Sequence, residues 1–317
     1  MKQKGGKLLP KVLFIVGPTA SGKTKLALEL AKEFKGEIIN ADARQVYRGL
    51  SIGTGKPMGE WKTARGNRAF FVEGVAHHLM DFVSSQKSIT VAEWRKKAIK
   101  TISDIVARHH LPIVVGGTGL YVQSLLDNLR IPAVPPDASY RTSISQKTLP
   151  ELVMLLSRMD PEGVKIIDTK NPRRVIRALE IITYTGLSLK EARGKNEPLL
   201  DPLVIGLMHD KALLHDRIDQ TIDRMMQEGW LQEVRGLLKK GIPLTAVAMS
   251  SIGYRELADV VVGKRPLEEA VVTIRRATKQ YAKRQMTWFK RDVRIHWMSQ
   301  REEGDTLLRS WLHPRTH

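Results

Sequence analysis

Residues 17–24 read GPTASGKT and match the phosphate-binding pattern G-x-x-x-x-G-K-[ST]. In such a loop, backbone N–H groups and the N-terminus of the following helix bind phosphate oxygens. The Lys23 ammonium would reach the outer phosphate, and the Thr24 hydroxyl would be a ligand for Mg²⁺. The loop therefore predicts a phosphate site with Mg²⁺, and it fits a kinase, an ATPase or a transferase that releases diphosphate. The predicted phosphate-binding residues are Gly17, Pro18, Thr19, Ala20, Ser21, Gly22, Lys23 and Thr24.

Two further polar side chains follow predicted strands. Asp42 comes just after the apolar pair Ile38 and Ile39, and Thr118 lies in GGTGLY after the apolar residues 112–115. The carboxyl ends of parallel strands form the edge of a sheet where α/β proteins bind ligands. A carboxylate there can act as a general base or bind Mg²⁺ through water, and the alternative for Asp42 is a helix cap or an Asx turn. The alternative for Thr118 is an ordinary strand-to-helix turn.

The elements that must position these residues alternate between strands and helices. Residues 12–16, VLFIV, are predicted to form a buried strand before the glycine loop. After the loop, apolar residues recur at helical spacing; they are Leu26, Ala27, Leu30, Ala31 and Phe34. Thr90 and Glu93 fit a capping box that starts another helix. Its apolar positions are Val91, Trp94, Ala98, Ile102 and Ile105. The order predicts an α/β fold with a parallel sheet flanked by helices.

The charge balance indicates a large anionic partner. The 317 residues include 52 Lys and Arg against 33 Asp and Glu, a net charge of +19, and 42% are hydrophobic, enough for a packed core. Such an excess favours nucleic acid as the partner, and no lipidation signal supports a membrane surface instead. The apolar run before the glycine loop is too short for a signal peptide or a membrane span.

Cysteine is absent, which excludes disulfides and thiolate metal sites and fits a reducing cytoplasm. The histidine pairs at 77–78 and 109–110 lack partners at metal-ligand spacing, so we expect no zinc site.

Eight segments, in order, carry a resemblance to a known family. They are GPTASGKT, ADARQVYRG, IGTGKP, HHLMD, GGTGLY, NPRRVIRALE, IGYRE and QYAKRQMTWFKR. Together they resemble the tRNA dimethylallyltransferase (tRNA isopentenyltransferase) family over about residues 11–291. The resemblance implies a P-loop NTPase-like parallel sheet, formed by residues 1–122 and 198–317 with C-terminal helices. Residues 123–197 would form a mainly helical insertion domain that grips the anticodon arm of tRNA.

The resemblance also implies a reaction. The family transfers a dimethylallyl group from dimethylallyl diphosphate to N6 of adenosine-37, next to the anticodon, and releases diphosphate. It prefers tRNAs that read codons beginning with U. Asp42 matches the family's general base, Thr118 a residue near the attacked carbon, and Arg217 an arginine that clamps the diphosphate. Arg224 follows seven residues after Arg217, so both are predicted to reach the diphosphate from one helix face.

Two basic helices are predicted to face the RNA. Asn171 and Pro172 read as the N-cap and first residue of a helix. Arg173, Arg174 and Arg177 then share one face, opposite a core stripe that contains Val175, Ile176, Leu179 and Ile182. In the second helix, within 273–291, the basic face consists of Arg275, Arg276, Lys279, Lys283 and Lys290. The packed face of that helix is predicted to consist of Ile274, Ala277, Tyr281 and Trp288.

The family match extends the predicted RNA contacts to residues in several segments, and the target base is expected to flip out of its stack. The predicted tRNA-binding residues are Asp42, Ala43, Arg44, Gln45, Thr118, Tyr140, Arg173, Arg174, Val175, Ile176, Arg177, Ser250, Gly253, Tyr254, Arg255, Lys279 and Lys283.

Two features depart from the family. Ala43 stands where the family often has Ser, and residues 61–76 are longer than usual, which we interpret as a surface loop. Three other functions remain open at this point: prenyl transfer to free adenine nucleotides, a small-molecule kinase, and a non-enzymatic RNA-binding switch. We expect a cytoplasmic monomer that uses Mg²⁺.

Overall fold

A computed structural model of the chain describes residues 3–4, 7–64, 67–299 and 301–313. Two compact units make up the chain, Met1–Leu125 with Leu199–His317, and Leu126–Pro198. The divisions at 125/126 and 198/199 lie close to those predicted at 122/123 and 197/198. The first division comes later because helix α3 (Gly119–Leu126) continues the larger unit.

The larger unit is built on an eight-stranded sheet in the order β12-β11-β3-β8-β4-β7-β6-β5. Six of its strands are parallel. They are β3 (Lys11–Val16), β4 (Gly36–Asn40), β7 (Val75–His78), β8 (Leu111–Gly116), β11 (Asp201–Leu207) and β12 (Ile295–Met298). The predicted α/β class is confirmed, since the sheet is mostly parallel and carries helices on its faces.

Two antiparallel strands, β5 (Glu60–Ala64) and β6 (Asn67–Val72), extend the sheet beyond β7. The interpretation of residues 61–76 as a surface loop was therefore wrong for the described part, while residues 65–66 lie outside it. Phe70 and Val72 alternate along β6 and are buried in the sheet's core, so their side chains stabilise the added strands. A separate short hairpin pairs β1 (Gln3–Lys4) with β2 (Lys7–Leu8).

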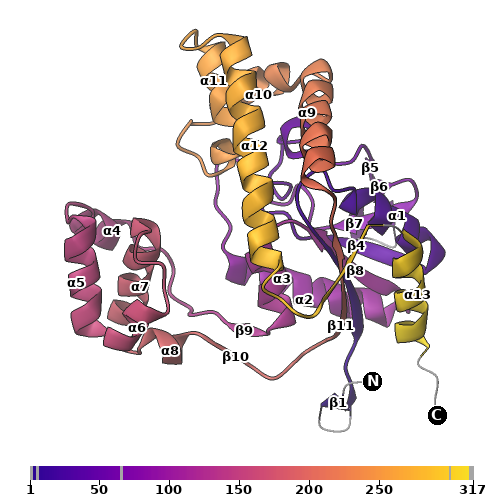
Figure 1. Cartoon of the computed structure of the whole chain (residues 1–317), viewed down its shortest axis with the longest axis horizontal. Helices are drawn as coiled ribbons and strands as arrows, with labels where there is room; N and C mark the ends of the chain where they lie inside the picture. The colour runs from indigo at the N-terminus through magenta and orange to yellow at the C-terminus, as the bar shows by residue number, and fades with distance from the viewer. Residues whose placement is uncertain (1–2, 5–6, 65–66, 300, 314–317) are drawn as a thin grey trace. The chain divides into compact units, whose positions relative to one another are not determined.

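Helices cover both faces of the sheet (Figure 1). On one face, α1 (Lys23–Glu33) and α13 (Arg301–Leu312) pack on a cluster that includes Leu13, Ile15 and Ile205. On the other, α2 (Val91–Ala107) contacts β4 and β8. The predicted capping box of Thr90 and Glu93 starts α2. The predicted apolar positions of α2 are buried except Val91, and the Trp94 ring stacks on Tyr121 at 4.2 Å.

The remaining helices of this unit lie beyond the carboxyl ends of the strands (Figure 1). They are α9 (Lys211–Gln227), α10 (Trp230–Lys239), α11 (Tyr254–Val261) and α12 (Leu267–Phe289), with the short turns η1 (Ile52–Thr54) and η2 (Ala248–Ser250). Helix α12 contacts α9 and α11, and α10 contacts α11. Among the described residues, no helix has both the length and the apolar composition that crossing a membrane requires.

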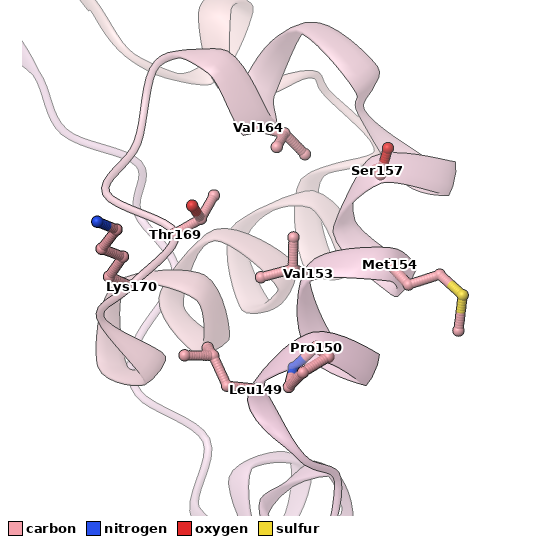
Figure 2. A pocket seen from close by; sticks show the side chains of 8 residues that line it. All are labelled: Leu149, Pro150, Val153, Met154, Ser157, Val164, Thr169 and Lys170. Carbon is pink, nitrogen blue, oxygen red and sulfur yellow. The ribbon is translucent and has the colours of Figure 1, made fainter.

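The smaller unit is helical, as the sequence predicts for the insertion. Its helices are α4 (Ala138–Ser145), α5 (Leu149–Met159), α6 (Pro161–Lys165), α7 (Pro172–Thr185) and α8 (Leu189–Ala192), joined by the pair β9 (Leu129–Arg130) and β10 (Gly194–Lys195). Asn171 caps α7 as predicted, because its side chain accepts hydrogen bonds from the N–H groups of Arg173 and Arg174. A mainly apolar hollow lies between α5 and α6 (Figure 2).

Candidate active site

The phosphate loop follows β3 at the centre of the sheet and ends in the first turn of α1. Gly17 packs so closely on β11 that a Cβ there would lie 2.7 Å from the Leu207 carbonyl oxygen. Gly22 is the N-cap of α1, with a φ of 90° that favours glycine. The sequence pattern thus folds as the loop that it predicts, with the N-terminus of α1 facing its ligand side.

Two of the loop's amides are already used within the protein. The Ser21 N–H donates to the Pro18 carbonyl at 3.3 Å, and the Thr19 N–H donates to Oε1 of Gln285 at 2.9 Å. In this structure these two N–H groups are therefore not available to a phosphate. The N–H groups best placed for an anion are those of Gly22, Lys23 and Thr24, which begin α1 and have no intrahelical partner.

Lys23 lies inside this loop, and its ammonium donates to the Pro18 carbonyl at 2.5 Å. Burial lowers the pKa of Lys23 to about 8, although the nearby charge of Asp42 raises it in part. Desolvation disfavours the ammonium, so an anion that replaces the lost water would stabilise it. The phosphate-binding role of Lys23 stays a prediction, which its position inside the loop supports.

Asn40 positions the backbone of Asp42 at the end of β4. Its side-chain oxygen accepts from the Asp42 N–H at 3.0 Å, and its side-chain nitrogen donates to the Leu79 carbonyl at 3.0 Å. Oδ1 of Asp42 accepts from the Arg44 N–H at 2.7 Å, which forms the Asx turn that the sequence left as an alternative. Oδ2 of Asp42 has no hydrogen-bond partner in the described part of the chain. The turn thus orients the carboxylate and leaves one oxygen able to accept a proton.

Thr118 joins this loop to the one after β8. Its hydroxyl oxygen accepts a hydrogen bond from the Ala43 N–H at 2.9 Å, and the Thr118 N–H donates to the Ala41 carbonyl at 3.2 Å. Strand β8 lies between β3 and β4, so the loop carrying Thr118 also borders the phosphate loop. The structure brings Asp42 and Thr118 together, as the sequence predicts.

Helix α12 packs on the GGTG segment residue by residue. A Cβ at Gly117 would lie 2.1 Å from the Gln285 amide nitrogen, and one at Gly119 would lie 2.3 Å from the Trp288 ring. Tyr281, one turn before Gln285 on the same helix face, lies close to Thr118. Positions 281, 285 and 288 share one helix face. The side chains at 285 and 288 occupy the space that a Cβ at 117 or 119 would need, which explains the glycines on both sides of Thr118.

Sequence reasoning missed Gln285 and gave Tyr281 only a packing role. Burial, with the nearby Asp42 charge, raises the pKa of Tyr281 to about 12, so its hydroxyl stays protonated at neutral pH. Gln285 is buried although it is polar, and its place beside the predicted apolar stripe was the available signal. Trp288, predicted to be packed, is 37% exposed.

Arg217 lies beside the phosphate loop, as predicted. Nη1 of Arg217 is 2.7 Å from Nε2 of His209. Nε2 of His209 is in turn 2.9 Å from the Ser21 carbonyl oxygen of the phosphate loop. Arg224, farther along α9, is exposed, and its guanidinium lies 3.7 Å from the Glu228 carboxylate. Only Arg217 of the two thus has a described contact that places it near a diphosphate.

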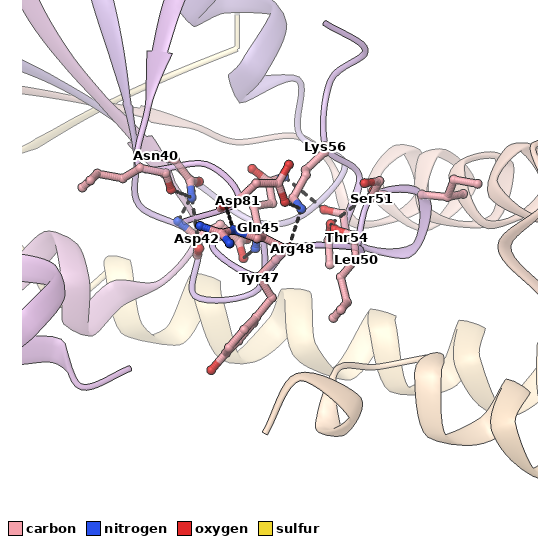
Figure 3. Close-up of polar contacts among 12 residues, drawn as sticks. Asn40, Asp42, Gln45, Tyr47, Arg48, Leu50, Ser51, Thr54, Lys56 and Asp81 are labelled. Atoms are coloured by element: carbon pink, nitrogen blue, oxygen red, sulfur yellow. Dashed lines mark hydrogen bonds and ion pairs between the residues drawn. The ribbon is translucent and has the colours of Figure 1, made fainter. Parts of the chain in front are cut away.

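Helix α10 holds the loop of residues 51–55, SIGTG, through Glu233. The Glu233 carboxylate accepts from the N–H groups of Ser51 and Ile52, both at 2.8 Å. Farther along the loop, the Lys56 ammonium pairs with Asp81 and donates to the Tyr47 carbonyl at 2.6 Å (Figure 3).

Two predicted RNA contacts, Gly253 and Tyr254, face the protein interior. The Tyr254 side chain is fully buried, and its hydroxyl donates to Glu233 at 2.6 Å. A Cβ at Gly253 would lie 2.1 Å from the Trp230 ring, and one at Gly53 would lie 1.9 Å from it. The Tyr254 side chain thus serves packing here and its role in tRNA binding stays a prediction, whereas Ser250 and Arg255 are exposed.

The basic face of α12 is narrower than predicted, because acids on α9 pair with part of it. Arg275 pairs with Asp219 and Asp223, and Lys279 pairs with Asp219 at 2.6 Å. The exposed basic residues along α12 and at its C-cap are Arg276, Lys283, Arg284 and Lys290. These four form what we call the open basic face.

In the smaller unit, α7 presents fewer arginines than the sequence predicted. Arg173 and Arg174 are exposed, with Arg174 3.3 Å from Asp168. Arg177 is partly buried, pairs with the fully buried Glu180 and donates to the Val134 carbonyl at 2.7 Å.

Three more predicted contacts in this unit serve packing within it. Val175 is fully buried in the unit's core, so its side chain serves packing, and its role in tRNA binding stays a prediction. Ile176 packs against the same core, and the Tyr140 hydroxyl is 3.1 Å from that of Thr183.

Two of the four paired histidines meet at a buried carboxylate. His78 and His110 lie 2.6 and 2.7 Å from Glu37, which also accepts two hydrogen bonds from Arg108. Burial alone would raise the pKa of Glu37, but these partners hold it well below its usual range. The cluster joins β4, β7 and the segment before β8 at the edge of the sheet opposite the site.

The sequence resembles proteins whose reaction is known. A sequence profile of the IPP transferase family matches residues 45–292. The tRNA dimethylallyltransferase of Acetivibrio thermocellus is 39% identical over 301 residues, 93% of each chain. The tRNA dimethylallyltransferase 1 of Pelobacter propionicus is 40% identical over 311 residues, 96% of this chain and 97% of that protein.

Solved structures are similar over the same extent. The tRNA isopentenylpyrophosphate transferase of Bacillus halodurans aligns with a TM-score of 0.69 and 36% identity, covering 95% of this chain and 96% of that one. A eukaryotic dimethylallyltransferase acting on tRNA aligns with a TM-score of 0.75 and 26% identity, covering 97% of this chain and 80% of that one.

Proposed function

This chain belongs to the IPP transferase family, and from that premise we propose that it modifies tRNA with a five-carbon prenyl group. The donor would be dimethylallyl diphosphate, and the acceptor would be N6 of adenosine-37 in tRNAs that read codons beginning with U. The observation that carries this proposal is the adjacency of the phosphate loop, Thr118 and Asp42 on neighbouring strands.

Asp42 would act on the acceptor. The adenine amine is a weak nucleophile because its lone pair is delocalised into the ring, so its proton must leave as the new bond forms. Oδ2 of Asp42 would take this proton while N6 bonds to the allylic carbon and the carbon–oxygen bond to diphosphate breaks. The Asx turn would hold the carboxylate in one orientation for this transfer.

The phosphate loop would stabilise the leaving group. The N–H groups of Gly22, Lys23 and Thr24 and the two cations Lys23 and Arg217 would surround the diphosphate as its charge develops. Charged groups inside a partly desolvated loop act more strongly than the same groups in water.

The residues of the loop fit a magnesium ion. The Thr24 hydroxyl is exposed at the start of α1, and the buried Ser21 hydroxyl has no hydrogen-bond partner in the described part of the chain. Thr24 would hold Mg²⁺, which would neutralise diphosphate charge and take its other ligands from diphosphate and water.

The exposed basic residues would bind the RNA. The open basic face of α12 is turned away from the helix side that carries Gln285 and Tyr281, so its cations would bind RNA phosphates while the other side of the helix contacts the site. The target base must leave its stack to reach Asp42. The proposal includes that the protein acts as a monomer and that it meets its tRNA substrate in the cytoplasm.

Labelled dimethylallyl diphosphate and an unmodified anticodon stem–loop test the proposal. We expect one labelled adenosine, identified by nucleoside mass analysis, and no label on AMP. Label on AMP without RNA would favour the free-nucleotide prenyltransferase, and ATP consumption with a phosphorylated metabolite would favour the kinase. The names of the relatives favour the tRNA reaction over the free-nucleotide reaction and over the kinase reaction.

A further inference from the structure

Gln285 is a buried polar residue on α12 that makes two hydrogen bonds to two different loops. Its Oε1 accepts from the Thr19 N–H of the phosphate loop at 2.9 Å. Its Nε2 donates to the Gly117 carbonyl, after β8, also at 2.9 Å. Only 5% of the residue is exposed, so neither bond competes with bulk water.

The two loops hold opposite ends of the reaction. The phosphate loop would bind the leaving diphosphate, and Thr118, directly after Gly117, contacts the loop that carries Asp42. The Gln285 side chain therefore spans from the leaving-group side to the acceptor side. Its amide matches the two groups in polarity, because one loop offers an N–H and the other a carbonyl.

We propose, on the premise of the proposed function, that Gln285 is a positioning residue that sets the distance between the diphosphate loop and the Thr118–Asp42 pair. Its contacts are with the backbone of the loops, so it would act on the donor's position rather than on the reacting atoms. Small misplacements of reacting groups are costly, up to about 100-fold in rate for roughly 1 Å.

The substitution Gln285→Met tests this, because methionine keeps the length and volume of glutamine but loses both hydrogen bonds. We expect kcat/KM for dimethylallyl diphosphate to fall at least about 10-fold, the size of one lost hydrogen bond in a buried site. The dissociation constant for inorganic diphosphate should rise in parallel. The dissociation constant for an unmodified stem–loop, measured without donor, should stay within about twofold.

Gln280→Met is the matched control, since Gln280 is exposed on the same helix. All constants of this variant should equal those of the unsubstituted protein. A variant that merely lost stability would show fewer active molecules, with KM for the donor unchanged.

A second variant disturbs the contact between Gln285 and Gly117 by changing the glycine instead of the glutamine. Gly117→Ala would place a Cβ 2.1 Å from the Gln285 amide nitrogen and displace it while the glutamine remains in the sequence. It should reproduce the loss of donor affinity, and it serves if Gln285→Met fails to fold.

Two results would overturn the inference. One is that kcat/KM for the donor and the dissociation constant for diphosphate stay within twofold of the unsubstituted protein in both variants. The other is that affinity for the stem–loop falls as much as affinity for diphosphate. Failure of the proposed function is distinguishable, because the unsubstituted protein itself would then neither prenylate the stem–loop nor bind diphosphate.

Discussion

The hydroxyl oxygen of Thr118 accepts a hydrogen bond from the backbone N–H of Ala43, 2.9 Å away. This bond joins the loop after β8 to the loop after β4 and holds Asp42 beside Thr118. Ala43 has no side-chain hydroxyl, yet the backbone at that position contributes a contact to the site. The candidate base is thus positioned from two neighbouring strands.

Replacing Asp42 by asparagine should remove the base and keep the fold. Asparagine retains an oxygen for the Arg44 N–H, so the Asx turn survives, but it does not accept the amine proton. We expect turnover to fall by roughly 100-fold or more, with stem–loop affinity unchanged. Single-turnover labelling and RNA binding measure the two effects, and Asp104→Asn, on the exposed side of α2, is the control. Unchanged turnover would remove Asp42 from its role.

Replacing Thr118 by valine should loosen the acceptor side of the site. Valine has the same shape but leaves the Ala43 N–H without its acceptor. The expected loss in kcat is about 10-fold, since 1.4 kcal/mol of lost transition-state stabilisation gives that factor. Thr118→Ser keeps the hydroxyl and should restore most of the rate. If serine and valine at this position behave alike, the hydroxyl has no role.

Diphosphate binding should be linked to the protonation of Lys23. The pKa of its ammonium in the free protein is about 8, and a bound anion would raise it. Below pH 8 the ammonium is already charged, whereas above pH 8 binding must take up a proton, so affinity should decline as pH rises. Calorimetry with inorganic diphosphate in two buffers of different ionisation enthalpy measures the uptake. Lys23→Met subtracts the ligand's own ionisation, and equal pH profiles for the two proteins would contradict the linkage.

Exposed and paired cations should differ in their effect on RNA binding. Lys283→Gln and Arg173→Gln each remove a surface charge that has no ion-pair partner among the described residues, so the slope of log affinity against log salt should flatten by about 0.7 per lost contact. Lys279→Gln removes a charge that Asp219 already neutralises, and its effect on the slope should be small. Fluorescence anisotropy of a labelled stem–loop across a salt series gives the slopes. The reverse order would mean that the pairs open on binding.

The Glu180 cluster should stabilise the smaller unit. Burial would raise the pKa of Glu180, but hydrogen bonds from Arg141, the Asp137 N–H and Arg177 lower it. The carboxylate therefore contributes stability above its unfolded pKa, and that contribution is lost as pH falls through the lower folded value. Arg177→Met should destabilise the unit by roughly 1–3 kcal/mol at neutral pH. Amide hydrogen exchange in α5 and α7 reports it, and Arg173→Met should leave exchange unchanged.

The parts of the structure that could be predicted from sequence are those set by local rules. The glycine loop, the capping box at Thr90 and the cap at Asn171 each depend on residues a few positions apart. The order of strands and loops then placed Asp42 and Thr118 at one edge, because parallel strands end together.

What was missed depends on contacts between distant segments. Helical periodicity gave the face on which Lys279 and Arg177 lie, but it does not reveal that Asp219 and Glu180 neutralise them. Gln285 was overlooked for the same reason, since its two partners are loops far away in sequence. Outside β6, residues 61–76 show no clear alternation of apolar and polar side chains, so the pairing of these strands could not be predicted from the sequence.

The indole of Trp230 fills the space that side chains at Gly53 and Gly253 would need. These three positions form one steric unit although they come from distant segments. A chimaera that took Trp230 from this chain and either loop from a parent without the matching glycine would clash there. Recombination between relatives therefore has to exchange all three together, which restricts where crossover points can fall in this catalytic unit.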